Sequence, residues 1–315
     1  MRRTLHLTSS LLAVFLLLLG SAGSTSAHAA GVHVLKVKPV HQAHRKGGGT
    51  LLFSHGGAIE TLPSVFISYW GPQWAGSGFS TGGYTSAQAQ TYVQSFFGSV
   101  GGSSWANSTT QYCQGVASGT TSCPATAAHP TNPANELAGT WNDTSALPSN
   151  ISQADVANAA LRAVAHFGYT ANANYMVFTP TGHSSNGFKT TWCAYHSSTS
   201  SSSGSVSFSY MPYQPDAGAS CGMNFVNPSN NAFGNGYFDG FSIVGGHEYG
   251  ETITDPFPNS GWLDGSGAEN GDKCAWISSG QGASANIALG GKNYAVQSLW
   301  SNAFNSATGG CVLSY

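Results

Sequence analysis

Charged side chains make up only 7% of this 315-residue sequence. Nucleic-acid binding depends on clustered Lys and Arg that neutralise phosphates, so charge this sparse excludes a phosphate-binding surface. Disorder is excluded on other grounds, because 41% hydrophobic and 12% aromatic residues are enough to build a core. Since few groups titrate, we also expect folding to depend weakly on pH.

The sequence lacks an apolar run long enough to cross a bilayer, which takes roughly 20 residues. The longest run covers residues 11–19, follows Arg2 and Arg3, and precedes small residues that end at Ala29. This order is typical of a signal peptide cleaved after a small-x-small motif. We therefore predict a signal peptide over residues 1–29 and a secreted, extracellular protein without a membrane span.

The rest of the chain divides into a short basic stretch and one large domain. Residues 30–50 are basic, carry several histidines and show no clear hydrophobic periodicity. We interpret them as a flexible leader or a short pro-segment. Residues 51–315 have a length that suits a single domain.

No Cys-x-x-Cys motif occurs, and the cysteine spacings do not match a zinc finger, which disfavours a thiolate metal site. The six cysteines form an even set, which in an oxidising compartment is typical of disulfides, although several connectivities are open. We predict nearest-neighbour pairing. The expected disulfides are Cys113–Cys123, Cys193–Cys221 and Cys274–Cys311.

Hydrophobic patterning predicts an α+β domain with a mixed sheet rather than a regular doubly wound one. The expected strands are residues 65–70, 175–178 and 206–210, and the expected helices are residues 86–97, 153–167 and 240–254. Stretches rich in Gly and Ser, over residues 98–149 and 197–205, predict loops.

Carboxylates are rare, and their placement is therefore informative. Of the 12 Asp and Glu residues, seven fall between residues 239 and 272. A solvated acidic face is less expected where charge is so scarce, so this concentration indicates a functional site. The seven residues are Asp239, Glu248, Glu251, Asp255, Asp264, Glu269 and Asp272.

The helix over residues 240–254 carries the strongest chemical signal. We expect Asp239 to cap its first turn. His247 and Glu251 are four residues apart on it, so they share a face and can bind one metal ion. Glu248 follows the first of these ligands, where the zincin motif His-Glu-x-x-His places its general base. Glu251 stands where that motif has its second His.

A third ligand has to come from outside this pair. Glu269 is the first choice, because a downstream Glu completes zinc sites of the thermolysin type, and Asp272 is the next. Asp255 shares the helix face but lies about 12 Å along the axis from His247, at about 1.5 Å per residue. We expect Asp255 to end the helix or to support the ligands.

Other interpretations of these residues stay open. The cluster could be a metal-free His–carboxylate network that fastens the last loop, or a calcium site, because calcium prefers oxygen ligands. His183 and His196 lie in predicted loops and are further candidate ligands. Two Gly-x-Ser-x-Gly motifs, at residues 78–82 and 218–222, match a serine-hydrolase elbow, but neither lies between a clear strand and a helix. The calcium ligands would be Glu251, Asp255, Glu269 and Asp272.

A family resemblance rests on several motifs that keep their order over residues 51–311. They are Ser-His-Gly-Gly at residues 54–57, Trp-Cys-Ala-Tyr-His at 192–196, Ile-Val-Gly-Gly-His-Glu-Tyr-Gly-Glu-Thr-Ile-Thr-Asp-Pro at 243–256 and Glu-Asn-Gly-Asp-Lys-Cys at 269–274. With these motifs the chain resembles the plant phosphate-induced/EXORDIUM family of secreted proteins and its bacterial relatives. The resemblance implies an extracellular or cell-wall location and a similar fold. Asp255 departs from it, since plant members usually have Asn at this position before the proline.

Together these features predict a secreted, zinc-dependent, metallopeptidase-like hydrolase that acts on extracellular protein or peptide. His247, Glu251 and Glu269 would bind Zn²⁺, and Glu248 would act as the general base. The competing hypothesis is a non-catalytic extracellular protein that binds cell-wall carbohydrate and uses the same cluster, or a Ca²⁺ site, structurally.

Overall fold

The structure is a computed structural model that describes residues 31–39, 50–228 and 236–315. The predicted signal peptide, residues 1–29, lies outside the described residues, as do residues 30 and 40–49 of the predicted leader. In the part of the chain that is described, no helix has the length and apolar character that a membrane span requires.

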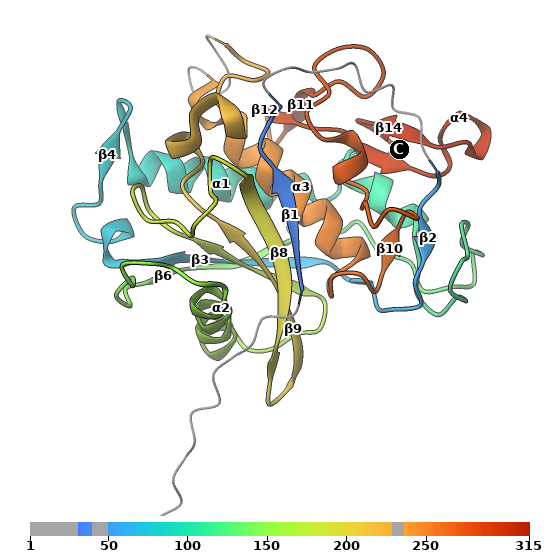
Figure 1. Ribbon diagram of the computed structural model, residues 1–315, viewed down its shortest axis with the longest axis horizontal. Helices are drawn as coiled ribbons and strands as arrows, with labels where there is room; N and C mark the ends of the chain where they lie inside the picture. The colour runs from blue at the N-terminus through green and yellow to red at the C-terminus, as the bar shows by residue number, and fades with distance from the viewer. Residues whose placement is uncertain (1–30, 40–49, 229–235) are drawn as a thin grey trace, which may run out of the picture.

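A six-stranded mixed sheet forms the centre of the domain (Figure 1). Strands β9, β7, β3 and β6 are parallel neighbours, whereas β8 and β1 pair antiparallel at the other edge. The predicted single domain with a mixed sheet is therefore confirmed. In spatial order the strands are β1 (Val32–Lys36), β8 (Trp192–Ser201), β9 (Gly204–Met211), β7 (Ala173–Phe178), β3 (Ser64–Trp70) and β6 (Leu137–Asp143).

Three long helices cover the sheet, and all three are at the positions predicted. Helix α1 (Ser86–Val100) links β3 to β6, and α2 (Gln153–Phe167) links β6 to β7. Each begins with a capping box, from Thr85 and Ser152, which satisfies free amide groups of the first turn. Figure 1 shows α2 below the sheet and α1 and α3 (Asp239–Thr254) above it, so the central strands are buried on both faces.

Shorter elements surround this frame. Four two-stranded pairs are β2 (Phe53–Ser54) with β10 (Trp262–Leu263), β4 (Ser80–Thr81) with β5 (Tyr84–Thr85), β11 (Ala285–Leu289) with β12 (Lys292–Val296), and β13 (Leu299–Ser301) with β14 (Gly310–Val312). The short helices are η1 (Pro72–Trp74), η2 (Ala106–Gln111), η3 (Gln214–Cys221), η4 (Gly236–Phe238), η5 (Asp272–Cys274) and α4 (Phe304–Ala307).

The three predicted disulfides are confirmed. Cys113–Cys123 closes a loop, Cys193–Cys221 joins β8 to η3, and Cys274–Cys311 joins η5 to β14. The second disulfide lies before α3 in the sequence and the third lies after it.

The structure differs from the sequence prediction in two segments that lie beside α3. Residues 32–36, expected in a leader before the domain, form β1 and pair with β8 in the central sheet. Residues 197–205, expected as a loop, are divided between β8 and β9, which form a hairpin. A smaller difference is β6, which interrupts the loop predicted over residues 98–149.

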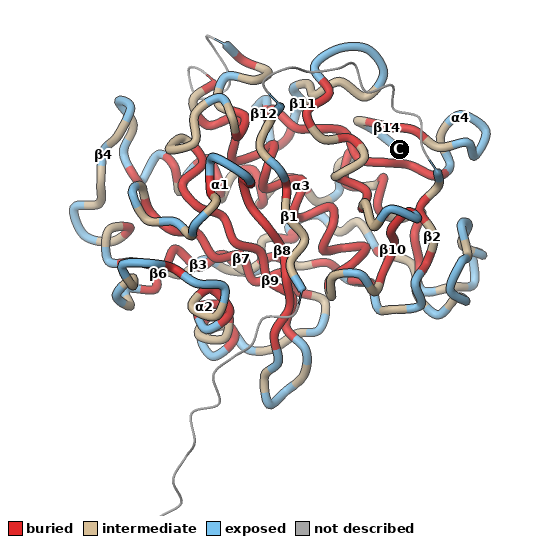
Figure 2. The backbone as a smooth tube through the Cα atoms, in the orientation of Figure 1, coloured by how far each residue is buried: buried red, intermediate tan, exposed pale blue. Residues whose placement is uncertain are grey.

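Helix α3 begins where it was predicted but not in the predicted way. Asp239 is its first residue and makes no cap. Its carboxylate instead accepts hydrogen bonds from the amide groups of Val226 and Asn227 and from the Asn227 side chain. All 16 residues of α3 are buried, as the red tube in Figure 2 shows. The helix therefore places its ionisable residues inside the protein.

Candidate metal centre

Seven ionisable side chains from four separate segments meet beside the middle of α3. The helix contributes His247, Glu248 and Glu251, β1 contributes His33, β8 contributes His196, and the segment around the start of η5 contributes Glu269 and Asp272. We call these residues the His–carboxylate cluster. All are wholly buried except His33 and Asp272, whose side chains are 15% and 23% exposed.

The pair predicted on α3 is formed as expected. His247 Nε2 lies 3.0 Å from Glu251 Oε1, which is the contact that a spacing of four residues allows along a helix. On the other side of the ring, Nδ1 of His247 lies 3.3 Å from the side-chain oxygen of Gln297. Gln297 in turn donates a hydrogen bond to the carbonyl of Gly271, so it links His247 on α3 to the segment that carries Asp272.

Glu269 and Asp272, the two predicted candidates for a third ligand, both reach the cluster. Oδ1 of Asp272 is 4.0 Å from His247 Nε2, and its other oxygen is 3.3 Å from His33 Nδ1. Glu269 contacts two other histidines: its Oε2 is 3.3 Å from His33 Nδ1 and its Oε1 is 3.5 Å from His196 Nε2. Asp272 is therefore the candidate that lies beside His247.

Strand pairing explains why His33 and His196 belong to the cluster. In the register of β1 with β8 these two residues are direct partners, and their ring centroids are 5.7 Å apart. The carbonyl of Gly267 holds the His33 ring at Nε2, at 2.9 Å. Sequence reasoning named His196 as a candidate but missed His33. The available signal was the β-branched pattern Val-His-Val at residues 32–34, which is typical of a strand.

Glu248 points to the cluster from the next position on α3. Its Oε2 lies 3.3 Å from His196 Nδ1, while its Oε1 is buried and has no hydrogen-bond partner. His196 Nδ1 also lies 3.5 Å from Glu251 Oε2. Glu248, the predicted general base, and Glu251, the predicted ligand, therefore both contact His196.

The approach of the η5 segment requires a glycine. A Cβ atom at Gly271 would lie 2.7 Å from His247 Nδ1 and 2.9 Å from Glu251 Oε1, which is closer than real contacts allow. With no side chain there, the amide group of Asp272 donates a hydrogen bond of 2.9 Å to Glu251 Oε1. Gly271 therefore allows the second segment of ligands to pack directly on α3.

Several polar atoms of the His–carboxylate cluster are buried without a hydrogen-bond partner. They are His33 Nδ1, His196 Nε2, His247 Nε2, Glu248 Oε1, Glu251 Oε2 and both carboxylate oxygens of Glu269. Buried polar atoms of this kind cost about 1–3 kcal/mol each when nothing satisfies them. Because they face one another, a shared cation or shared protons would satisfy several at once.

Electrostatics inside the cluster are strongly coupled. Burial lowers the pKa of His33 and His247, but the carboxylates, chiefly Glu251, outweigh it and raise the two pKa values to about 10 and about 9. Burial raises the pKa of Glu251, but His247 and His33 hold it well below its usual range. Burial also raises the pKa of Glu248, and it raises that of Glu269 with help from the charge of Glu251. Without a cation, protons on these groups keep the buried charge balanced.

The remaining predicted site residues have other surroundings. The Asp255 carboxylate accepts hydrogen bonds from the amide groups of Asn259, Ser260 and Gly261, so it closes the turn after α3 as expected. One of its oxygens is still close enough to His196 and Glu269 to share a metal ion with them. His183 contacts the side chain of Gln73 instead, 3.0 Å away.

The two Gly-x-Ser-x-Gly motifs lie apart from the cluster, and two tryptophans close to it in the sequence are core residues. Trp262 and Trp276 are buried, with 1% and 4% exposure, and belong to the core. Ser220, in the second Gly-x-Ser-x-Gly motif, donates to the carbonyls of Ala217 and Lys189, and Ser80 lies in the short strand β4. A surface hollow lined in part by Gly56, Gly57, Gln114 and Thr126 contains none of the cluster residues.

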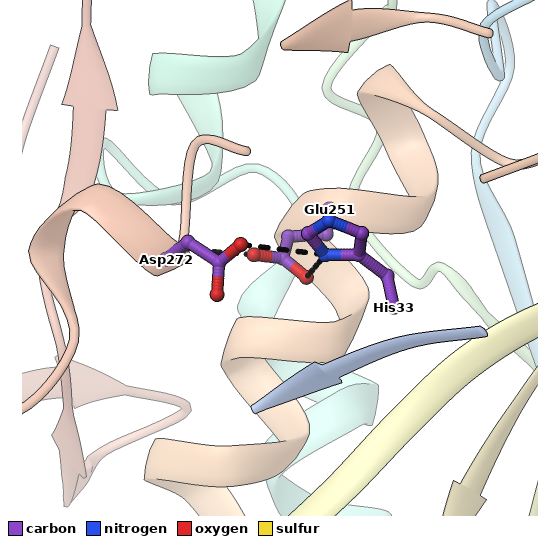
Figure 3. Close-up of side chains that lie close together, drawn as sticks. All are labelled: His33, Glu251 and Asp272. Atoms are coloured by element: carbon purple, nitrogen blue, oxygen red, sulfur yellow. Dashed lines mark hydrogen bonds and ion pairs between the residues drawn. The ribbon is translucent and has the colours of Figure 1, made fainter. Parts of the chain in front are cut away.

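Groups of three donors that could hold a metal ion are therefore present in the described residues, and Glu251 belongs to two of them. One is His33, Glu251 and Asp272 (Figure 3), and the other is His196, Glu248 and Glu251. Compared with protein-family models, curated proteins and solved structures, the chain shows no significant match. The resemblance to the phosphate-induced/EXORDIUM family accordingly stays a prediction from motifs.

Proposed function

We propose that this protein is a secreted, zinc-dependent hydrolase of proteins or peptides whose active centre is the His–carboxylate cluster. The observation that carries the proposal is the set of buried imidazole nitrogens and carboxylate oxygens around Glu251 that have no hydrogen-bond partner. A metal-free network would be expected to satisfy its own hydrogen bonds, because unpaired buried polar atoms are costly. Here imidazole nitrogens and carboxylate oxygens are directed at one another across distances of 3.0–4.0 Å.

The donor types favour zinc over calcium. Calcium takes six to eight oxygen ligands, whereas zinc is bound by imidazole nitrogen and carboxylate oxygen in smaller sets. Three imidazoles face the cluster, and His33 and His247 present unpartnered nitrogens to Glu251 and Asp272. His247, Glu251 and Glu269 are the ligands proposed from the sequence, and the position of Asp272 adds this residue to the set.

Glu248 is the group proposed to move protons. It combines one oxygen held near His196 with one buried oxygen that has no partner. In this role it takes a proton from the attacking water and returns it to the leaving amine. A divalent ion held by its neighbours would supply Lewis acidity towards the scissile carbonyl. Substrate would approach past His33 and Asp272, the two cluster members with solvent exposure.

A secreted location is supported by the three disulfides, which persist in oxidising compartments. The carbohydrate-binding alternative has less support. Sugar stacking needs exposed aromatic rings, and the exposed large hydrophobic residues in the described part of the chain are Leu62 and Tyr315. A structural metal centre is the second candidate, and the near-complete burial of the cluster favours it.

Metal analysis combined with peptide turnover tests the proposal. We expect the purified protein to contain zinc and to cleave a mixed peptide library. Glu248→Gln should keep its zinc and lose at least about 100-fold in kcat/KM, the range expected for a general base. Glu136→Gln, which alters a buried carboxyl outside the cluster, is the matched control and should retain both properties. Bound zinc without turnover would indicate the structural centre, and absence of zinc would refute the proposal.

A further inference from the structure

Two carboxylates of the cluster each divide their oxygens between two histidines. Glu251 places Oε2 at 3.9 Å from His33 Nδ1 and Oε1 at 3.0 Å from His247 Nε2. Asp272 does the same, with Oδ2 at 3.3 Å from His33 Nδ1 and Oδ1 at 4.0 Å from His247 Nε2. The two imidazoles therefore contact different oxygens of the same pair of carboxylates. Figure 3 shows the His33 side of this arrangement.

The number of donors exceeds what a single zinc ion can use. Zinc takes about four ligands in a tetrahedral arrangement. On the β1 side, His33, Glu251 and Asp272 supply three donor atoms that all lie within 4.8 Å of one another, and Glu269 Oε2 adds a fourth donor 3.3 Å from His33 Nδ1. Ligands at the zinc bond length of about 2.0–2.1 Å lie about 3.3–3.5 Å apart at the corners of a tetrahedron. The contacts of Glu269 and Asp272 with His33 match this spacing, so this side can hold one ion, and His247 is not among its donors.

We infer that the cluster holds two metal ions bridged by the carboxylates of Glu251 and Asp272. The outer ion has His33 and Glu269 as its own ligands, and the inner ion has His247. Two-metal hydrolytic sites place their ions about 3.5–4 Å apart, a separation that a bridging carboxylate spans. The inference rests on the proposed function for the presence of metal, but it does not require catalysis.

Existing hydrogen bonds leave the bridging oxygens available. Glu251 Oε1 accepts one hydrogen bond, from the amide group of Asp272, and an oxygen with two lone pairs can still bind a cation. Glu251 Oε2 has no hydrogen-bond partner. Around His247, Gln297 faces Nδ1, which leaves Nε2 as the nitrogen directed at the carboxylates.

The two proposed ions depend on different parts of the chain, because only the outer ion has a ligand on β1. The outer ion needs His33, which is far from the other ligands in sequence and is placed by the pairing of β1 with β8 and by the contact with the Gly267 carbonyl. The inner ion depends on α3 and on Asp272. Removing the His33 imidazole should therefore release one ion and leave the other, which a mononuclear site cannot do.

The test is metal stoichiometry. Metal-free protein is titrated with zinc and, separately, with cobalt(II), and bound metal is counted by mass spectrometry of the intact chain and by elemental analysis. We expect two ions per chain for the unaltered protein, one for His33→Ala and two for His183→Ala, a histidine outside the cluster. Near-ultraviolet circular dichroism checks folding. If His33→Ala fails to fold, Glu269→Gln removes a ligand of the same ion and should also leave one.

The outcomes separate the inference from the proposed function. One ion per chain in the unaltered protein, or two in folded His33→Ala, would overturn the two-ion site and leave a zinc hydrolase intact. No bound metal would refute both. Electron paramagnetic resonance of the cobalt form tests the bridge, because magnetic coupling between two bridged ions weakens the signal per ion. We expect a weaker signal per ion in the unaltered protein than in His33→Ala. Equal signals per ion would overturn the bridge.

Discussion

The side-chain oxygen of Gln297 lies 3.3 Å from Nδ1 of His247, on the opposite side of the ring from Glu251. The Gln297 oxygen can accept a hydrogen bond from Nδ1–H, which fixes the imidazole with Nδ1 as the donor and Nε2 directed at the carboxylates. An outer contact of this kind orients a metal-binding histidine and increases its basicity. Gln297 is therefore a positioning residue for the proposed inner ion.

Gln297→Leu should weaken zinc binding by about 10–100-fold, the usual range for the loss of such a contact. Competition with a fluorescent chelator measures the affinity. Gln297→Glu keeps an acceptor of the same length and should stay within a few-fold of the parent protein. Equal affinities for the Leu and Glu variants would show that the contact does not orient His247.

Gly271→Ala should remove zinc binding and destabilise the fold by about 1–3 kcal/mol, the range for overpacking. The added Cβ would be placed 2.7 Å from His247 Nδ1 and 2.9 Å from Glu251 Oε1, closer than real contacts allow. Gly265→Ala is the matched control, because a Cβ at Gly265 meets nothing within 4 Å. Urea denaturation and zinc titration of both variants check the prediction, and a Gly271→Ala protein as stable as the control contradicts it.

Removal of metal should lower the thermal stability of the protein. The buried carboxylates Glu248, Glu251 and Glu269 would then depend on protons alone for charge balance. At 1,000 times its Kd, a bound ion contributes about 4 kcal/mol. Differential scanning calorimetry with and without a chelator measures the change, and addition of zinc should reverse it. Glu251→Gln protein should show a much smaller response, and an equal response would place the metal elsewhere.

Stability should also fall as the pH rises from about 4.5 to 8, owing to two buried carboxyl groups outside the cluster. Burial raises the pKa of Glu136 from 4.5 to about 8, and burial together with the charge of Glu136 raises that of Glu60. The folded chain then keeps protons that the unfolded chain has released, so the stabilisation present at low pH is lost as the pH passes through the folded pKa.

Urea denaturation at pH 5 and pH 8 tests this dependence. The parent protein should lose a few kcal/mol over this interval, at 1.36 kcal/mol per pKa unit as an upper scale. The double variant Glu60→Gln/Glu136→Gln should lose less, and the difference between the two proteins isolates these groups. Parallel curves would contradict the shifted pKa values. The weak pH dependence expected from the scarcity of charge did not take burial into account. Few carboxyl groups are present, but several of them, including Glu60 and Glu136, are buried.

Local signals in the sequence predicted the helices and the disulfides well. Ser152 with Asp155, and the apolar spacing of α1, are short-range features that act within one element. The pairing of His247 with Glu251 was predictable for the same reason, since helix geometry alone brings residues four apart together.

Features that depend on distant partners were missed. β1 is a five-residue edge strand whose neighbour, β8, is rich in serine, a residue with no strong preference for strands. Ser197, Ser198 and Thr199 are buried in β8 because sheet neighbours and helices enclose them, which no local pattern records. His33 and its place in the cluster follow only from this pairing.

The contact between His33 and Gly267 joins residues 234 positions apart in the sequence. Closing so large a span belongs to the late and slow part of folding, because local contacts form first and long-range pairing follows. The cluster is therefore completed only after the segments around His33 and Gly267 have come together in the folded domain. If the cluster binds metal as proposed, it would take its ions from the solution in which folding is completed.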